Sequence, residues 1–140
     1  MRIIRADMLV ERATRSFAES RAGNSKAIDE LRYGAIRQFA KAMTEPDEDA
    51  NVWVAARHLN EARNKVAHLL ENAAPEIERN LVNFFKAIGV KPAQTPEDFE
   101  QAVMQLCQSI FTLKENWVTR KKMYESIVRD FESGQLVWRK

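Results

Sequence analysis

Arg63 and His68 are the residues of this chain best suited to chemistry, and Asn64 lies directly beside Arg63. An arginine presents a planar fork that matches two phosphate oxygens and stays charged. A histidine has an unperturbed pKa of about 6.5, so it can give or take a proton at neutral pH. All three residues lie in an apolar-periodic segment that we expect to be helical from about Ala50 to Glu71. Together they could bind a phosphate and move a proton.

Helical geometry leaves a purely structural interpretation open. At about 100° per residue, Arg63 falls in the middle of its segment's apolar stripe. There it could extend past Leu59 and Val66 to solvent, or pair with an acid such as Glu30. His68 falls on the opposite face, as a solvated surface histidine would. Five positions turn a helix by about 140°, so the two side chains converge only around the helix or across two copies of the chain.

The residues around Arg63 resemble the signature of the HEPN superfamily. That signature is an arginine, a polar residue directly after it, and a histidine a few residues beyond. The segment reads Leu59-Asn60-Glu61-Ala62-Arg63-Asn64-Lys65-Val66-Ala67-His68-Leu69-Leu70. Elsewhere the chain is similar to the superfamily only in its size and helical character.

The resemblance implies a metal-independent endoribonuclease of the toxin or phage-defence type that acts as a homodimer, with the motif helices of two copies facing each other. The 2′-hydroxyl of RNA would attack the adjacent phosphate and leave a cyclic phosphate end. Arg63 would neutralise the scissile phosphate, His68 would move the proton, and Asn64 would orient the backbone or the histidine. No cofactor would be needed, and an antitoxin or a nucleotidyltransferase could be a partner protein.

The resemblance also leaves a second function open. The mannitol-operon-repressor group has a similar Arg-Asn…His segment and is assigned to regulation. The chain could therefore be a non-catalytic helical regulator or protein-interaction module. Catalysis requires Arg63 and His68 to face an open, positively charged cleft, whereas a module can bury them in an interface. We favour the endoribonuclease.

Four basic residues are weaker candidates for RNA contacts. Lys65 lies inside the motif, and Arg120, Lys121 and Lys122 form a basic run. Such a run is more often a solvated helix face than an RNA track.

The remaining chemical candidates are expected to be structural. His58 lies about 15 Å from His68 along a helix axis and about 80° around it, so the two do not share a metal. We expect His58 at the surface or on the rim of the site. Two histidines and one cysteine, Cys107, are too few for a four-ligand zinc site, so no metal is expected. Cys107 has apolar neighbours and is expected to serve packing.

Proline and glycine positions predict that five helices hold these residues in an all-α bundle. Strict alternation of apolar and polar residues is absent, which argues against strands. The expected helices run from about Arg5 to Ala22, Lys26 to Met43, Ala50 to Glu71, Pro75 through Ile88, and Pro96 to Ser133.

Several details of these helices are also predicted. Ser25 is expected to cap the second helix, and Gly34 inside it suggests a close helix–helix approach. Leu9 and Leu31 are assigned to the buried stripes of the first and second helices. The acidic run Glu45–Asp49 would be favourable at the N-terminus of the third helix.

The last segment is unusually long. Thr95, Pro96 and Asp98 form a helix-start pattern, and the apolar spacing then continues to Phe131. Unbroken, the helix would measure about 57 Å, which exceeds the diameter of a domain this size. We therefore predict that it breaks or bends between Lys114 and Lys122, or that it reaches a partner.

Length and composition set the outer limits. The chain has 140 residues, 45% of them apolar, which suits one domain over residues 1–134 and a short apolar tail over 135–140. One cysteine cannot form an internal disulfide, no apolar run is long enough to cross a membrane, and the start is charged. These features predict a cytoplasmic protein without a membrane segment. A net charge of +2 is too small to indicate a nucleic-acid binder by itself.

Overall fold

Six helices and no strand make up the part of the chain that the structure describes, residues 2–68 and 73–134 of a computed structural model. The expectation of an all-α bundle is confirmed, with one helix more than predicted. The helices are α1 (Arg2–Arg21), α2 (Ser25–Asp29), α3 (Tyr33–Ala42), α4 (Asn51–Ala67), α5 (Ala74–Ile88) and α6 (Pro96–Glu132). The predicted tail at 135–140 and the predicted helix end at Glu71 lie outside the described residues.

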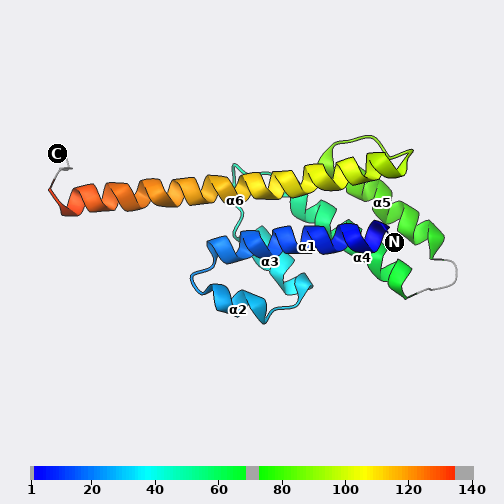
Figure 1. Cartoon of the computed structure of the whole chain (residues 1–140), viewed down its shortest axis with the longest axis horizontal. Coiled ribbons are helices and arrows are strands. Elements are labelled where there is room, and N and C mark those ends of the chain that lie inside the picture. The colour runs from blue at the N-terminus through cyan, green and yellow to red at the C-terminus, as the bar shows by residue number, and fades with distance from the viewer. Residues whose placement is uncertain (1, 69–72, 135–140) are drawn as a thin grey trace.

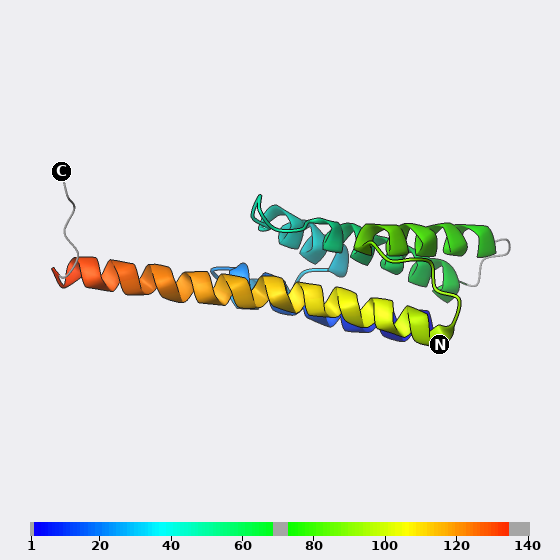
Figure 2. The same cartoon turned by 90° about the horizontal axis from the view of Figure 1, so that it is seen from above.

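The helices pack in two layers (Figures 1 and 2). α1 lies along the N-terminal half of α6, and α4 lies along α5. Aromatic rings fill the core between the layers: the centroids of Phe17 and Trp53 are 4.8 Å apart, and Phe84 lies 5.3 Å from Phe85 and 6.2 Å from Phe99. Burial of these side chains is the main stabilising contribution to the bundle.

The predicted second helix is split into α2 and α3, so the single helix from Lys26 to Met43 is wrong. The chain turns at Arg32, whose backbone is extended (φ −70°, ψ 155°). Arg15 on α1 supports the turn, because its guanidinium donates to the carbonyl oxygens of Ile28 at 3.5 Å and Leu31 at 3.4 Å. These are carbonyl groups that a continuous helix would have used internally.

The structure overturns four details predicted for the first two helices. Asn24, rather than Ser25, caps α2 by accepting a hydrogen bond from the Lys26 backbone at 3.2 Å. Gly34 makes no close helix approach, because a Cβ there would meet only a guanidinium atom at 3.8 Å. Leu31 lies in the turn between α2 and α3 and is exposed, and Leu9 on α1 is exposed as well.

Residues on both sides of this turn are buried. Ile28 and Ile36 both pack against Ala18 of α1 and form a small second core. Ala40 follows Ile36 at helical spacing and joins the main core.

Local signals set the ends of α5 and α6 as expected. The Thr95 hydroxyl accepts from the Asp98 backbone N–H at 3.1 Å, and the Asp98 carboxylate accepts from the Thr95 backbone N–H at 3.3 Å. This reciprocal pair is a capping box. Gly89 ends α5 with φ +72°, a conformation that glycine adopts without steric cost.

α6 runs without interruption, so the break predicted between residues 114 and 122 is wrong (Figure 1). Contacts with α1 hold this stretch: the Lys114 amine donates to the Ser16 hydroxyl at 2.6 Å, and the Trp117 indole donates to the Ser20 carbonyl at 3.0 Å. The helix-propensity penalty of the polar residues here is only a few tenths of a kcal/mol each, about 0.7 at most. These contacts therefore outweigh it.

The last part of α6 projects beyond the bundle, as Figures 1 and 2 show. We call residues 121–132 the α6 arm. Four apolar side chains of the arm, Met123, Tyr124, Ile127 and Val128, are each more than half exposed. Exposed apolar groups gathered in this way usually mark a contact surface.

Arg21 joins three parts of the fold. Its guanidinium is fully buried and binds both oxygens of Glu48, at 2.6 and 2.8 Å. It also donates to the carbonyl oxygens of Met43 at 2.7 Å and Leu113 at 3.1 Å. Two residues of the acidic run therefore have different roles. Asp49 accepts from the first backbone N–H of α4 at 2.9 Å, as expected, whereas Glu48 neutralises Arg21.

Candidate active site

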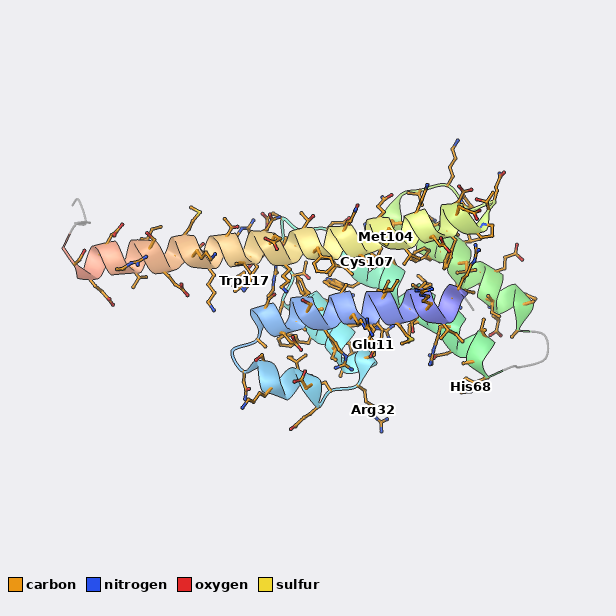
Figure 3. The ribbon with its side chains drawn as sticks, in the orientation of Figure 1. Glu11, Arg32, His68, Met104, Cys107 and Trp117 are labelled. Carbon is orange, nitrogen blue, oxygen red and sulfur yellow. The ribbon has the colours of Figure 1, made fainter. Side chains whose placement is uncertain are left out.

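Arg63 and Asn64 lie near the C-terminal end of α4, and His68 is the residue that caps it. The His68 backbone N–H donates to the Asn64 carbonyl at 3.1 Å, so the helical conformation extends to His68. The His68 side chain is exposed, at the end of the molecule opposite to the α6 arm (Figure 3). His68 thus stands at the end of α4.

Arg63 sits on the apolar stripe as predicted, but its partner differs from the one expected. Its side chain is 40% exposed, and its Nε lies 4.0 Å from Oδ2 of Asp7 on α1. The internal acid is thus Asp7, and not Glu30, because α1 rather than α2 faces this part of α4. The Arg63 Nη1 also donates to Oδ1 of Asn64 at 3.1 Å.

A polar network holds Arg63 and Asn64 in place. Asn60, one turn before Asn64, donates from Nδ2 to Oδ2 of Asp7 at 3.1 Å. The Nδ2 of Asn64 donates to Oδ1 of Asn60 at 3.5 Å. The network therefore runs from a buried carboxylate on α1, through two asparagines, to a partly exposed guanidinium.

Asp7 is the buried anchor of this network. Burial raises the pKa of its carboxyl, although the hydrogen bond from Asn60 and the charge of Arg63 act to lower it. Its second oxygen, Oδ1, has no hydrogen-bond partner among the described residues. A buried carboxylate with one unsatisfied oxygen lowers the stability of the folded protein.

The network joins the Arg63 guanidinium to Asn64, whose backbone position is nearer than that of Arg63 to His68 around the helix. Asn64 is four residues before His68, so the two side chains differ by only about 40° around the helix. The contacts with Asp7 and Asn64 therefore place the guanidinium between α1 and the Asn64 side chain. No hydrogen bond or ion pair joins Arg63 directly to His68 within the described part of this single copy.

Two of the four predicted RNA-binding residues are paired with acids. Lys65 forms an ion pair with Glu76 of α5 at 2.9 Å, and Arg120 forms one with Asp47 at 2.8 Å. Hydrogen bonds from these basic side chains lower the pKa values of both carboxyl groups. Lys65 and Arg120 thus serve contacts within the chain.

Lys121 and Lys122 are exposed, but they lie on the α6 arm, away from the end of α4 (Figures 1 and 3). The structure therefore does not bring the basic run to the Arg63–His68 motif.

His58 and Cys107 are both packed. His58 is not the surface residue we expected: its Nδ1 lies 3.1 Å from Oδ1 of Asn80, and its side chain is only 14% exposed between α4 and α5. Cys107 is buried, as expected, and burial raises the pKa of its thiol. A thiol held in its neutral form is a poor nucleophile.

Asp7 and Asn60 are the site residues that sequence reasoning missed. A signal for Asp7 was present, because it is an acid one turn before Val10 on the inward stripe of α1. A signal for Asn60 was also present, because it precedes Asn64 by one helical turn. Nothing in either local sequence indicates that the two meet across α1 and α4.

No group of three metal-ligating side chains occurs within residues 2–68 and 73–134. Across the same residues, no helix is both long and apolar enough to span a membrane. Comparison of the chain with protein families, with curated proteins and with solved structures finds no match.

Proposed function

We propose that the chain is a metal-independent endoribonuclease of the HEPN type that acts as a homodimer. One observation carries the proposal: the hydrogen bond at 3.1 Å that draws the Arg63 guanidinium to Asn64, one turn before the exposed His68. A phosphate-binding group and a proton-transfer group then share one end of α4. The resemblance of this segment to the HEPN signature supports the same reading.

Each residue has a definite role in the proposed reaction. His68 takes the proton of the RNA 2′-hydroxyl, and the resulting oxygen nucleophile attacks the adjacent phosphorus. The bond from phosphorus to the 5′-oxygen breaks, which leaves a 2′,3′-cyclic phosphate on one fragment. The leaving 5′-oxygen takes up a proton, and His68 of a second copy could supply it. Arg63 binds the non-bridging oxygens, where charge develops in the transition state.

Asn64 has a positioning role in this proposal. Because it accepts from Arg63 and donates toward Asn60, it holds the guanidinium against the network anchored on Asp7. A fixed guanidinium stabilises developing charge without first having to be ordered.

The test is a cleavage assay with purified protein. We expect cleavage of RNA but not of DNA of the same sequence, and we expect it to persist in EDTA. His68→Ala should lower the rate by about 10²–10⁴-fold, and Arg63→Ala by about 10²–10³-fold. His58→Gln, at the other histidine, is the matched control and should cleave like the natural protein. Full activity of His68→Ala, or no cleavage of any RNA tried, contradicts the proposal.

Oligomeric state tests the second part of the proposal. Light scattering should show a dimer for the natural protein and for both site variants, which separates loss of chemistry from loss of structure. A strict monomer at high concentration would contradict the two-copy site.

A second candidate function is a non-catalytic helical regulator or interaction module. The exposed apolar side chains of the α6 arm favour it, because such groups are usually covered by another surface. If the folded protein cleaves no RNA, this second function is the one that the structure supports.

A further inference from the structure

A basic hollow lies between α3 and α4, on a surface that neither the motif nor the predicted basic run includes. Its volume is about 240 Å³. Its lining residues are Gly34, Arg37, Gln38, Lys41, Trp53, Val54 and Arg57. Three of them are cations, and none of them is acidic.

The three cations come together for simple geometric reasons. Arg37 and Lys41 are one turn apart on α3, so their side chains share a face. Arg57 reaches the same hollow from α4. Gly34 also lines the hollow, and because it has no side chain it does not fill the space between the three cations.

Arg37 is only partly neutralised. Its guanidinium carbon lies 4.8 Å from the centre of the Tyr33 ring, and its charge also acts on Asp7. Its Nη1 is buried and has no hydrogen-bond partner among the described residues. The buried Nη1 faces the interior, but Arg37 also lines the hollow and forms no ion pair among the described residues, so its charge adds to that of the two neighbouring cations. Three cations around one hollow are suited to bind an anion with several oxygens.

The neighbouring cations are available as well. Arg57 makes only a long contact with Glu61, 3.8 Å between exposed side chains. Lys41 is exposed and has no acid within ion-pair distance among residues 2–68 and 73–134. The hollow thus carries an excess of positive charge at the surface.

The hollow lies on the face of α4 that carries Asn64 and His68, about 120° around the helix from Arg63. Taking Arg57 as zero, Asn64 and His68 lie within about 20° of it around the helix. Eleven residues separate Arg57 from His68, or about 16 Å along the axis. A few nucleotides of single-stranded RNA span that distance, and a basic groove that follows the backbone is how such strands are held.

We propose that this hollow binds a backbone phosphate of single-stranded RNA, a few nucleotides away from the phosphate held at Arg63. The inference rests on the proposed function for the identity of the strand. Arg37, Lys41 and Arg57 supply the charge, and the distance to His68 sets how far the bound phosphate lies from the scissile one. Glu61, on the same face between the two sites, opposes the strand by its charge.

The test measures binding apart from cleavage. A labelled twelve-nucleotide RNA, 2′-O-methylated so that it cannot be cut, is titrated with the full chain, and binding is followed by fluorescence anisotropy. The double variant Lys41→Ala with Arg57→Ala changes exposed residues only. We expect it to weaken binding about tenfold and to reduce the slope of log K against log salt by about 0.7, as loss of one phosphate contact should. Glu61→Gln should strengthen binding.

Lys122→Ala with Lys121→Ala is the matched control, because it removes two exposed cations from the α6 arm. It should leave the affinity near that of the natural protein. If both double variants weaken binding equally, general surface charge is responsible and the hollow is not a site. Titration with inorganic phosphate separates a free anion from a strand: tight binding of phosphate that competes with RNA would overturn the assignment to a backbone phosphate.

The outcomes also separate this inference from the proposed function. If the hollow variants lose binding while the natural protein cleaves no RNA, the hollow stands and the nuclease fails. If the natural protein cleaves RNA and the hollow variants bind like it, the nuclease stands and the hollow fails.

Discussion

Glu48→Gln should be among the most destabilising single changes outside the apolar core. The Glu48 side chain is only 4% exposed, and both of its oxygens bind the fully buried Arg21. Glutamine keeps the shape but removes the negative charge, so Arg21 is left as a buried cation without its counter-charge. Such a loss costs about 3–5 kcal/mol.

The lower end of that range applies here. Arg21 keeps two carbonyl acceptors after the change, those of Met43 and Leu113. Its guanidinium also stays over the rings of Phe17 at 4.3 Å and Trp117 at 5.1 Å. We therefore expect a loss of about 3 kcal/mol, which corresponds to about 10 °C in Tm for a chain of this size.

Asp47→Asn is the matched control, because Asp47 is the neighbouring residue and also binds an arginine. Its pair with Arg120 is exposed, so solvent already screens the charge. Urea unfolding followed by circular dichroism at neutral pH should place Asp47→Asn close to the natural protein and Glu48→Gln far below it. Equal midpoints for the two variants would refute the reasoning, because the burial of the Arg21 pair would then have no energetic consequence.

The pH dependence of Glu48 gives a second readout. Hydrogen bonds from Arg21 lower the pKa of Glu48 from its usual value of 4.5. A carboxyl whose pKa is lowered in the folded state stabilises the protein above its unfolded pKa and loses that contribution as the pH falls through its folded pKa. The difference in stability between the natural protein and Glu48→Gln should therefore narrow in acid below pH 4.5. A constant difference would contradict the assignment.

Two further predictions use pairs of readouts. Ile110 is 1% exposed and Ile127, on the same helix, is 51% exposed. Ile110→Ala should therefore lower the free energy of unfolding by about 2–5 kcal/mol, whereas Ile127→Ala should change it by less than about 0.5 kcal/mol. Equal losses in urea unfolding would contradict this prediction, because they would show that the α6 arm is packed. Asp7→Asn should raise stability at neutral pH and lower RNA cleavage, because burial raises the pKa of Asp7 and its charge anchors the network of Arg63. In acid, Asp7 of the natural protein is protonated and no longer costs stability, so the gain from Asp7→Asn should shrink as the pH falls. A variant that is less stable than the natural protein at pH 7 would contradict this prediction.

Sequence reasoning predicted the parts of the fold that depend on local signals. Thr95 and Asp98 are three residues apart and form the capping box that starts α6, and Gly89 ends α5. The break between α2 and α3 was missed because Arg15, on another helix, supports it. The continuity of α6 was missed for the same reason, since Trp117 is held by a carbonyl of α1.

The candidate site shows the same division. Arg63 and His68 were found because their spacing is visible in one short segment. Asp7 is far from them in sequence and meets Arg63 only because α1 packs on α4. The basic hollow draws its residues from two helices, neither of which has a basic run at that point, so it too depended on the tertiary arrangement.

The contacts of α1 with α6 have a consequence for the order of folding. Arg21 and Leu113 are 92 residues apart, and Ser16 and Lys114 are 98 apart. Closing so long a loop costs about 4 kcal/mol in chain entropy before these contacts return any energy. During synthesis, α1 emerges well before α6, which is its principal partner. Until α6 has been made, the apolar side of α1 and the charge of Arg21 remain only partly covered, so the N-terminal helices alone form an incomplete core that is open to misassociation.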